Sequence, residues 1–83
     1  MFYVYVVFNK KVNKFYIGQT ENLAERVRFH NNKFFKGSYT SRFDGAWELV
    51  YSEVYSNRVD AVKREKQLKS FRGRQFVKQH IPG

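Results

Sequence analysis

The chain opens with an unbroken apolar segment, residues 2–8, in which every side chain is β-branched or aromatic. Such side chains favour extended backbone, and a short segment that is apolar at every position is typical of a strand buried on both faces. Residues 9–14 are mostly polar, and strand-type residues resume over 15–19. A short polar connection between two such segments predicts an antiparallel β-hairpin.

After the hairpin the apolar spacing changes to that of an α-helix. Leu23, Val27 and His30 recur at intervals of four and three residues, which places them on one helical face. Asn22 is suited to cap the first turn, and we expect the helix to end at residues 31–32.

The next segment, residues 32–45, mixes glycine, serine and lysine with four aromatic residues, so we expect an ordered loop rather than a flexible linker. Residues 46–55 then return to an alternating pattern that predicts a third strand. The alternation is expected to place two sets of side chains on opposite sides of this strand, Trp47, Leu49 and Tyr51 on one and Val50 and Val54 on the other.

Two further helices are expected after the third strand. One spans roughly residues 57–70 and is capped by Ser56 or Asn57, and a shorter one follows over about residues 71–80. The apolar face of the longer helix consists of Ala61, Val62 and Leu68. The order β-β-α-β-α-α within a single domain, residues 1–83, predicts an α+β fold in which helices cover a small antiparallel sheet.

The chain is strongly basic. Sixteen lysines and arginines against seven acidic residues give a formal net charge of +9, and eight of the sixteen lie between Arg58 and Lys78. A polyanion such as nucleic acid is the natural partner. The charge is also consistent with a solvated basic face that keeps a small domain soluble. An anionic membrane surface is less favoured, because the apolar face of the basic segment is expected to pack in the protein's own core.

Composition excludes several kinds of chemistry. Cysteine is absent, which rules out thiol catalysis and cysteine-based zinc sites. Nine Phe and six Tyr supply the bulk of a core without disulfides. The sequence contains no stretch of about 18 apolar residues and no cleavable signal pattern, so we expect a cytoplasmic location.

Two polar side chains of the first predicted helix lie beside its apolar face. Arg26 lies three residues after Leu23. His30 lies three residues after Val27, so both side chains project toward the strands rather than into solvent. Both also have a structural interpretation, in which Arg26 covers the rim of the core and His30 is satisfied at its boundary.

Glu65 falls within the apolar face of the second predicted helix. It follows Ala61 by four residues and precedes Leu68 by three. Burial of an unpaired carboxylate is costly, so Glu65 needs a cation, a metal ion or an opening to solvent. A structural salt bridge to Arg26 and a functional role are equally consistent with the helix geometry.

Tyr5 and Tyr16 lie on the two strands of the predicted hairpin, so their phenols meet at one end of the sheet if they share a face. Isolated tyrosines of this kind are usually packing residues. Together with Arg26, His30 and Glu65, however, they supply the groups that phosphodiester hydrolysis requires. Arginine donates paired hydrogen bonds to phosphate, and glutamate can hold a divalent ion.

These residues resemble the GIY-YIG nuclease domain over nearly the whole chain. Tyr16-Ile17-Gly18 matches the second signature intact, and Tyr3-Val4-Tyr5 stands in place of the first. Arg26 lies at the arginine position of the family, and Glu65 lies in the helix where the family carries its metal ligand.

The resemblance is strongest to the small stand-alone bacterial members, related to the N-terminal domain of the excision-repair nuclease. Residues 47–51 and 61–69 carry this closer likeness. Two positions depart from the family pattern. Tyr3 replaces the glycine of the first signature, and Gln19 replaces a lysine that some members carry.

The resemblance implies a three-stranded antiparallel sheet flanked by helices, and an endonuclease that hydrolyses phosphodiester bonds with Mg²⁺ or Mn²⁺. A tyrosine, Tyr5 or Tyr16, would act as base or orient water. Arg26 would stabilise the transition state, and Glu65 would bind one divalent metal ion. His30 corresponds to a histidine that assists proton transfer in some branches.

The expected substrate is nucleic acid, with DNA favoured. The residues expected to contact it are Lys33, Lys36, Tyr39, Arg42, Lys63, Arg64, Lys66, Lys69, Arg72, Arg74 and Lys78. Phosphate contacts position a substrate without reading its sequence, so we expect specificity to come from nucleic-acid structure or from a protein partner. The rival interpretations are a catalytically silent nucleic-acid-binding module on the same fold and a protein-interaction domain.

Overall fold

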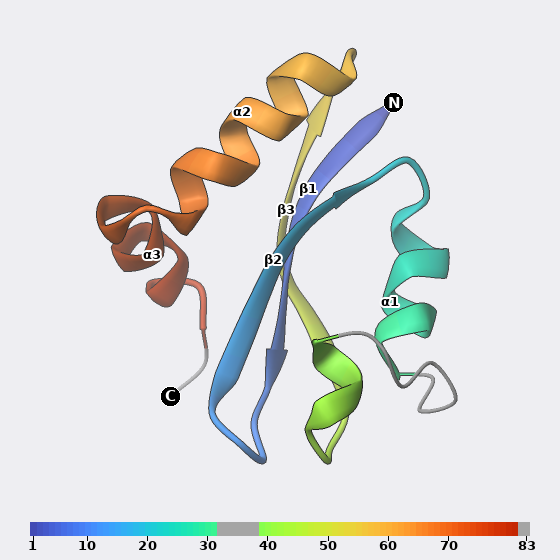
Figure 1. The fold of residues 1–83 in the computed structure, drawn as a ribbon, viewed down its shortest axis with the longest axis vertical. Helices are drawn as coiled ribbons and strands as arrows, with labels where there is room; N and C mark the ends of the chain where they lie inside the picture. The colour runs from blue at the N-terminus through green and yellow to red at the C-terminus, as the bar shows by residue number, and fades with distance from the viewer. Residues whose placement is uncertain (32–38, 82–83) are drawn as a thin grey trace.

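The computed structural model describes residues 1–31 and 39–81 and confirms the predicted α+β fold (Figure 1). The elements, in chain order, are β1 (Phe2–Asn9), β2 (Lys14–Thr20), α1 (Leu23–Asn31), the short 3-10 helix η1 (Thr40–Arg42), β3 (Glu48–Tyr55), α2 (Arg58–Lys69) and α3 (Phe71–Lys78). Within the described ranges, no helix is long and apolar enough to cross a membrane.

The three strands form one antiparallel sheet in the order β2-β1-β3, so β1 is the central strand. All of its residues from Val4 to Asn9 are buried. Successive side chains of a strand point to opposite faces. Val4 and Val6 accordingly enter one core cluster, whereas Tyr5 and Val7 enter a second cluster on the other face. This is the two-sided burial that the apolar run predicts.

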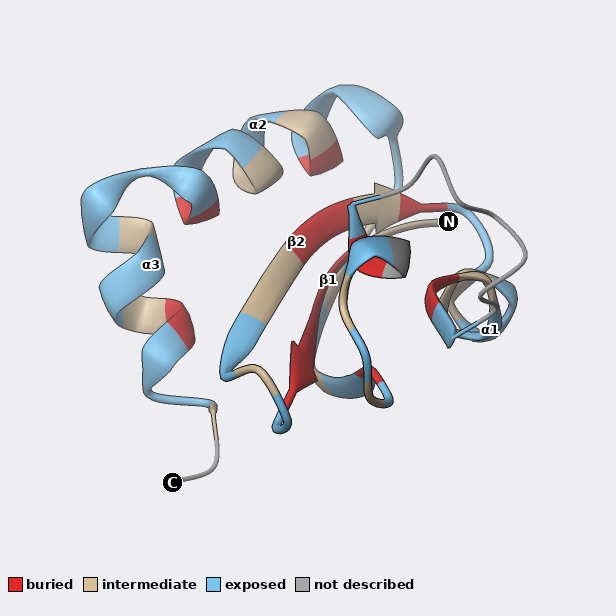
Figure 2. Ribbon diagram, turned by 60° about the horizontal axis from the view of Figure 1, so that its bottom comes forward, coloured by how far each residue is buried: buried red, intermediate tan, exposed pale blue. Residues whose placement is uncertain are grey.

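Helices cover both faces of the sheet (Figure 1, Figure 2). On one face α2 and α3 contribute Ala61, Leu68 and Val77 to the first core cluster. On the other face α1 packs Leu23 and Val27 against the second cluster. The sheet therefore separates α1 from the two C-terminal helices everywhere except at its edges.

One predicted feature of β3 is wrong. The pairing of β3 with β1 shifts by one residue between Tyr51 and Leu49, so Val50 is an extra residue in a β-bulge. A bulge breaks the alternation of side chains along a strand. Trp47 therefore packs on the α1 side of the sheet, and Tyr51 packs on the opposite side with α2 and α3. The sequence pattern predicted that these two side chains share a face.

Both predicted helix caps are confirmed. The side chain of Asn22 accepts a hydrogen bond from the backbone N–H of Glu25 at 3.1 Å, at the start of α1. The side chain of Asn57 accepts one from the N–H of Asp60 at 2.9 Å, at the start of α2. Each cap satisfies a backbone donor that the first helical turn leaves free.

A largely buried carboxylate, Glu53 of β3, links the sheet to α2. It accepts hydrogen bonds from the hydroxyls of Tyr51 and Tyr55, and from Nε of Arg64 at 2.9 Å. Burial raises the pKa of Glu53, but the hydrogen bonds from Arg64 and the two tyrosines outweigh burial and lower the pKa overall. Arg64, expected to contact nucleic acid, thus holds α2 against the sheet and has fewer donors available to a phosphate.

The helices α2 and α3 meet at Ser70, which ends the first and caps the second. Its hydroxyl oxygen accepts a hydrogen bond from the backbone N–H of Gly73 at 3.2 Å. A Cβ added at Gly73 would overlap the carbonyl oxygen of Gln67 and lie 2.7 Å from the carbonyl carbon of Leu68. Glycine is therefore what allows α3 to start so close to the last turn of α2.

The substitution Gly73→Ala should destabilise the fold, although alanine normally stabilises a helix by up to about 1 kcal/mol relative to glycine. The added Cβ must push α3 away from α2, so we expect a net loss of roughly 1–3 kcal/mol in the free energy of unfolding. Urea denaturation measures this loss. Gln75→Ala, at an exposed position of the same helix, is the matched control and should change stability by less than about 0.5 kcal/mol. Unchanged stability of Gly73→Ala would contradict the close crossing.

Candidate active site

The phenol ring of Tyr5 lies across the backbone of Gly18, its partner in the neighbouring strand. A Cβ added at Gly18 would lie 2.6 Å from the hydroxyl oxygen of Tyr5 and 3.0 Å from Cε2 of Tyr16. Both distances are shorter than van der Waals contact. With glycine present, the two tyrosine rings share one face of the sheet, with centroids 6.4 Å apart. The motif Tyr16-Ile17-Gly18 thus has a steric reason for its last residue.

His30 of α1 connects Tyr5 to the turn before β3. Its Nε2 lies 2.7 Å from the hydroxyl of Tyr5, and its Nδ1 lies 2.8 Å from Oγ1 of Thr40. The indole of Trp47 donates a hydrogen bond to the carbonyl oxygen of Thr40 at 3.1 Å. All four residues are buried. Because both ring nitrogens of His30 are engaged, the orientation of the imidazole is fixed.

Burial sets the protonation states of His30 and Tyr5. It lowers the pKa of His30 to about 4, and the positive charge of Arg26 contributes in the same direction. Burial also raises the pKa of Tyr5; Tyr16 raises it further, Arg26 lowers it, and Glu65 raises it. At neutral pH the short contact therefore joins a neutral phenol to a neutral imidazole.

Arg26 and Glu65 act on Tyr5 from opposite faces of the sheet. Arg26 belongs to α1 and Glu65 to α2, and the charges of both are close enough to shift the pKa of Tyr5. They converge because β2 is an edge strand, around which groups from the two faces can meet. The sequence pattern predicted that both helices face the sheet, and the structure places them on opposite sides of it.

Glu65 lies at the margin of the core, with 20% of its side chain exposed. Its Oε1 lies 3.8 Å from Nζ of Lys69, one helical turn later. Among the described residues, this lysine rather than Arg26 is the ion-pair partner of Glu65. The guanidinium of Arg26 instead lies 5.1 Å from the ring centroid of Phe29. The structural salt bridge between Arg26 and Glu65 that helix geometry allowed is therefore not formed.

Tyr16 lies where the site opens to solvent. Its ring centroid is 5.0 Å from that of His30 and 5.9 Å from that of Tyr39, on which it is stacked. Tyr16 is partly exposed, whereas Tyr5 is buried. Of the two candidate tyrosines, Tyr16 is thus the one that a substrate can reach directly.

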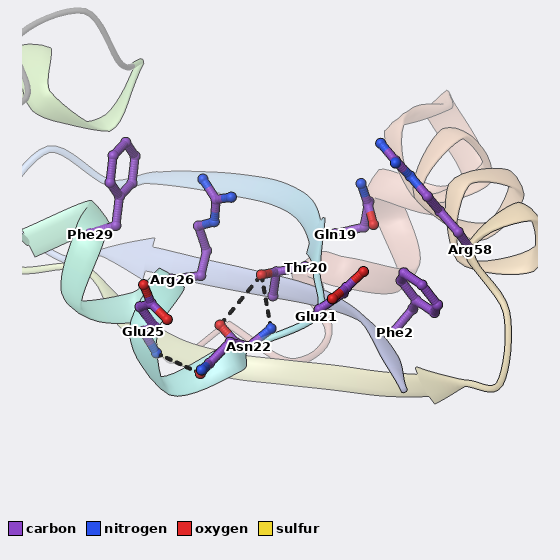
Figure 3. Close-up of a pocket in the computed structure, with 9 residues that line it drawn as sticks. All are labelled: Phe2, Gln19, Thr20, Glu21, Asn22, Glu25, Arg26, Phe29 and Arg58. Carbon is purple, nitrogen blue, oxygen red and sulfur yellow. Dashed lines mark hydrogen bonds between the residues drawn. The ribbon is translucent and has the colours of Figure 1, made fainter.

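Two open grooves flank this convergence of side chains. One, which we call the mixed groove, has a volume of about 490 Å³ and contains Gln19, Glu21, Glu25, Arg26 and Arg58 (Figure 3). The other, which we call the basic groove, has a volume of about 530 Å³ and contains Lys14, Tyr16, Tyr39, Lys69 and Arg74. Figure 3 shows Gln19 of β2 standing between Arg26 of α1 and Arg58 of α2.

The residues expected to contact nucleic acid fall into separate places. Those that line the basic groove are Tyr39, Lys69 and Arg74. Those that are exposed on helical surfaces elsewhere are Arg42, Lys63, Lys66, Arg72 and Lys78. Arg64 is held by Glu53. Lys33 and Lys36 lie outside the described residues.

A family model for the GIY-YIG catalytic domain matches residues 1–78. The chain belongs to the GIY-YIG family. It is similar to a UPF0213 protein of Staphylococcus haemolyticus, at 36% identity over 76 residues, which covers 92% of this chain and 89% of that protein. A UPF0213 protein of Clostridium perfringens is 38% identical over 69 residues, covering 83% and 71% of the two chains. The solution NMR structure of a UPF0213 protein from Bacillus halodurans matches with a TM-score of 0.54 and 26% identity, over 95% of this chain and 84% of that one.

These comparisons confirm the resemblance on which the expected site was based. The GIY-YIG domain is a nuclease domain, and the similar bacterial proteins carry it at nearly the same length. The roles of individual residues in this GIY-YIG chain stay predictions, because the similar proteins are named by group and not by activity.

Two residues of this GIY-YIG site, Thr40 and Lys14, are not identified as site residues by the sequence pattern. Thr40 lies in the segment expected to be a loop, where no periodicity marks it, and its contact with His30 joins positions ten residues apart. Lys14 falls in the polar connection of the predicted hairpin, yet it is the first residue of β2 and lines the basic groove. The one available signal for Lys14 was its place two residues before Tyr16.

The donor set of this GIY-YIG site fits a loosely held divalent ion. Glu65 offers a carboxylate that is partly open to solvent. Within residues 1–31 and 39–81, no group of three or more His, Cys, Asp or Glu side chains is arranged to hold a metal. Mg²⁺ usually keeps several waters and takes its other ligands from one or two carboxylates and substrate phosphate. A single carboxylate therefore suits Mg²⁺ or Mn²⁺ shared with substrate, and does not form a closed protein cage.

The substitution Gly18→Ala should displace the ring of Tyr5 and break its contact with His30. We expect a loss of roughly 1–3 kcal/mol in the free energy of unfolding, measured by urea denaturation. The closest atom to the new Cβ is the hydroxyl oxygen of Tyr5, so Tyr5→Phe should relieve part of the clash. The double variant should then cost less than the sum of the two single variants by more than about 0.5 kcal/mol. Additive costs would contradict the steric account.

The low pKa of His30 predicts a pH dependence of stability. Because the pKa falls from 6.5 in the unfolded chain to about 4 in the fold, the unfolded state binds a proton first as pH decreases. The stability contributed by neutral His30 is thus fully present above pH 6.5 and is lost progressively toward pH 4. Relative to His30→Gln, which lacks this titration, the wild type should lose on the order of 2–3 kcal/mol over that range. Urea denaturation at several pH values gives the difference, and parallel profiles would contradict a buried neutral histidine.

Proposed function

We propose that this chain is a divalent-metal-dependent endonuclease that hydrolyses phosphodiester bonds in DNA. The observation that carries the proposal is that the charges of Arg26 and Glu65, from opposite faces of the sheet, both act on Tyr5, whose ring shares a face of the sheet with that of Tyr16. Membership of the GIY-YIG family implies a nuclease. The net charge of +9 favours nucleic acid as the substrate.

Arg26 is assigned to the scissile phosphate. Its side chain borders the mixed groove, and its positive charge shifts the pKa values of His30 and Tyr5. A guanidinium in this place can donate two parallel hydrogen bonds to phosphate oxygens and offset the negative charge that develops in the transition state.

The two tyrosines take different parts in the proposal. Tyr16 is partly exposed in the basic groove, so its hydroxyl is the one that orients or deprotonates the attacking water. Tyr5 is buried and its pKa is raised, so its phenol stays protonated at neutral pH. His30 holds the hydroxyl of Tyr5 in position through the 2.7 Å contact, and we assign it to positioning the pair.

Glu65 is assigned to the metal. Its carboxylate would provide one oxygen ligand, and water and substrate phosphate would complete the coordination. When bound there, Mg²⁺ or Mn²⁺ supplies positive charge to the phosphate and to the leaving oxygen. Lys69 lies 3.8 Å from the same carboxylate, so its ammonium competes for Glu65.

That competition favours one rival function, a catalytically silent nucleic-acid-binding module on the same fold. In such a module the ion pair between Lys69 and Glu65 persists, and Arg26 binds an intact phosphate. Both functions predict binding that weakens with salt. Only the nuclease predicts strand cleavage that requires a divalent ion.

Plasmid nicking separates the two functions. Wild-type protein should convert supercoiled plasmid to the open form with Mg²⁺ or Mn²⁺, and EDTA should abolish the reaction. Glu65→Gln should lower the rate by roughly 10²–10³-fold, because it removes the charged ligand of the metal ion. Arg26→Lys should lower it by roughly the same factor, because lysine keeps the positive charge but cannot donate two parallel hydrogen bonds to the phosphate. Tyr16→Phe should lower it by roughly 10²–10⁴-fold if its hydroxyl acts on the water.

Glu48→Gln is the matched control for Glu65→Gln. It removes an exposed carboxylate from β3, at the opposite edge of the sheet, and should nick at the wild-type rate. The enzyme proposal fails if folded wild-type protein binds DNA and never nicks it. It fails equally if Glu65→Gln nicks as fast as Glu48→Gln.

A further inference from the structure

The edge strand β2 has grooves of different charge at its two ends. The basic groove lies beside the start of the strand, at Lys14 and Tyr16, and the mixed groove lies beside its end, at Gln19 and Thr20. The candidate catalytic side chains connect the two, since Tyr16 lines the first groove and Arg26 lines the second. A strand of nucleic acid laid along this edge would pass through both grooves.

Three cations from three different elements line the basic groove. They are Lys14 of β2, Lys69 of α2 and Arg74 of α3. None of the described residues that line this groove carries a carboxylate. Arg74 donates a hydrogen bond from Nε to the carbonyl oxygen of Lys69 at 3.1 Å, which fixes its side chain and leaves its terminal nitrogens for a ligand. The groove is thus already arranged for anionic groups.

The mixed groove differs in its charge balance. Two arginines, Arg26 and Arg58, are offset there by two carboxylates, Glu21 and Glu25. In Figure 3, Glu25 lies on the Arg26 side of the groove and Glu21 on the Arg58 side. A phosphate that enters this groove beyond Arg26 meets repulsion as well as attraction.

We propose that the protein grips its nucleic-acid strand on one side only of the scissile phosphate, through backbone phosphates bound in the basic groove. The proposal rests on the nuclease function above and specifies how that site holds its substrate. Lys14, Lys69 and Arg74 neutralise phosphates on the gripped side. On the other side the balanced charges give no net attraction. After cleavage, one product strand therefore stays bound while the other is released.

Tyr39 adds a second kind of contact on the gripped side. Its ring is stacked on that of Tyr16, and the residue is 42% exposed, so it offers an apolar surface beside the cations. A sugar or base of the gripped strand can pack on this surface while its phosphates meet the cations. The mixed groove offers Phe2 at its far end, away from Arg26 in Figure 3.

Binding without cleavage tests the grip independently of catalysis. Fluorescence anisotropy of a labelled DNA oligonucleotide in EDTA, over about 50 to 300 mM salt, gives the slope of log affinity against log salt. The double variant Lys14→Gln/Arg74→Gln should reduce this slope by roughly 1.4–1.8 and weaken binding more than about tenfold. Arg58→Gln, which removes one charge from the mixed groove, should leave the slope unchanged and weaken binding far less, because no phosphate is bound there. A loss of binding by Arg58→Gln as large as that of the double variant overturns the proposal.

All three substituted positions are exposed, and thermal unfolding of each variant shows whether it remains folded. Lys14→Gln alone provides a second test, because among the described lining residues Lys14 is the cation that no helix carries. It should reduce the slope by roughly 0.7–0.9. An unchanged slope for a folded Lys14→Gln also overturns the proposal.

Cleavage near the ends of oligonucleotides tests the one-sidedness. Each end of the oligonucleotide is labelled in turn. On the side that is not bound, cuts should occur within one or two nucleotides of the end. On the bound side, cuts should stop roughly three to four nucleotides from the end, because a shorter segment lacks phosphates for the three cations. Equal exclusion at both ends overturns the grip and leaves the nuclease function standing. Absence of any cleavage by protein that shows the expected salt slopes rejects the nuclease function, whereas the slopes themselves still support phosphate binding in the basic groove.

Discussion

The contact between the phenol of Tyr5 and the backbone of Gly18 is the constraint on which the candidate site depends. A side chain at Gly18 would push the ring off β2 and separate its hydroxyl from His30. His30 in turn is fixed by Thr40, and Thr40 is fixed by the indole of Trp47. One missing Cβ thus allows residues from β1, α1, η1 and the segment just before β3 to form a single buried chain of hydrogen bonds. Burial then keeps that chain uncharged at neutral pH.

Because the sheet in the described part of the chain has only three strands, side chains from both of its faces can contribute to one site. The helices α1 and α2 pack on opposite faces, yet Arg26 and Glu65 both act on Tyr5. Neighbouring strands lie about 4.8 Å apart, so each further strand outside β2 would lengthen the path around the edge. With β2 at the edge, both charges act on Tyr5 and the strand stays accessible. The same edge carries both grooves, which places the proposed substrate-binding surface beside the candidate catalytic residues.

The large positive charge of the chain serves two different purposes. Arg64 is bound by Glu53 and secures α2 to β3, and Lys69 is shared between Glu65 and the basic groove. Arg74 is positioned by a backbone carbonyl and keeps donors for a ligand. Net charge alone does not separate these uses, because a cation that is paired with a carboxylate and one that is free contribute equally to the sum. The distribution of carboxylates decides which surface attracts an anion.

Much of the fold could be predicted because it depends on residues that are close together in the sequence. The two-sided burial of β1, the caps Asn22 and Asn57 and the helical spacing are all local properties, and the structure confirms them. The candidate catalytic residues were likewise found from residue type, helical face and the signature motif. Only the tertiary structure decided that Val50 forms a bulge, that Arg64 is held in an ion pair and that Thr40 orients His30. It also placed the two candidate charged residues on opposite faces of the sheet. These features depend on contacts between segments far apart in the chain, about which local spacing carries no information.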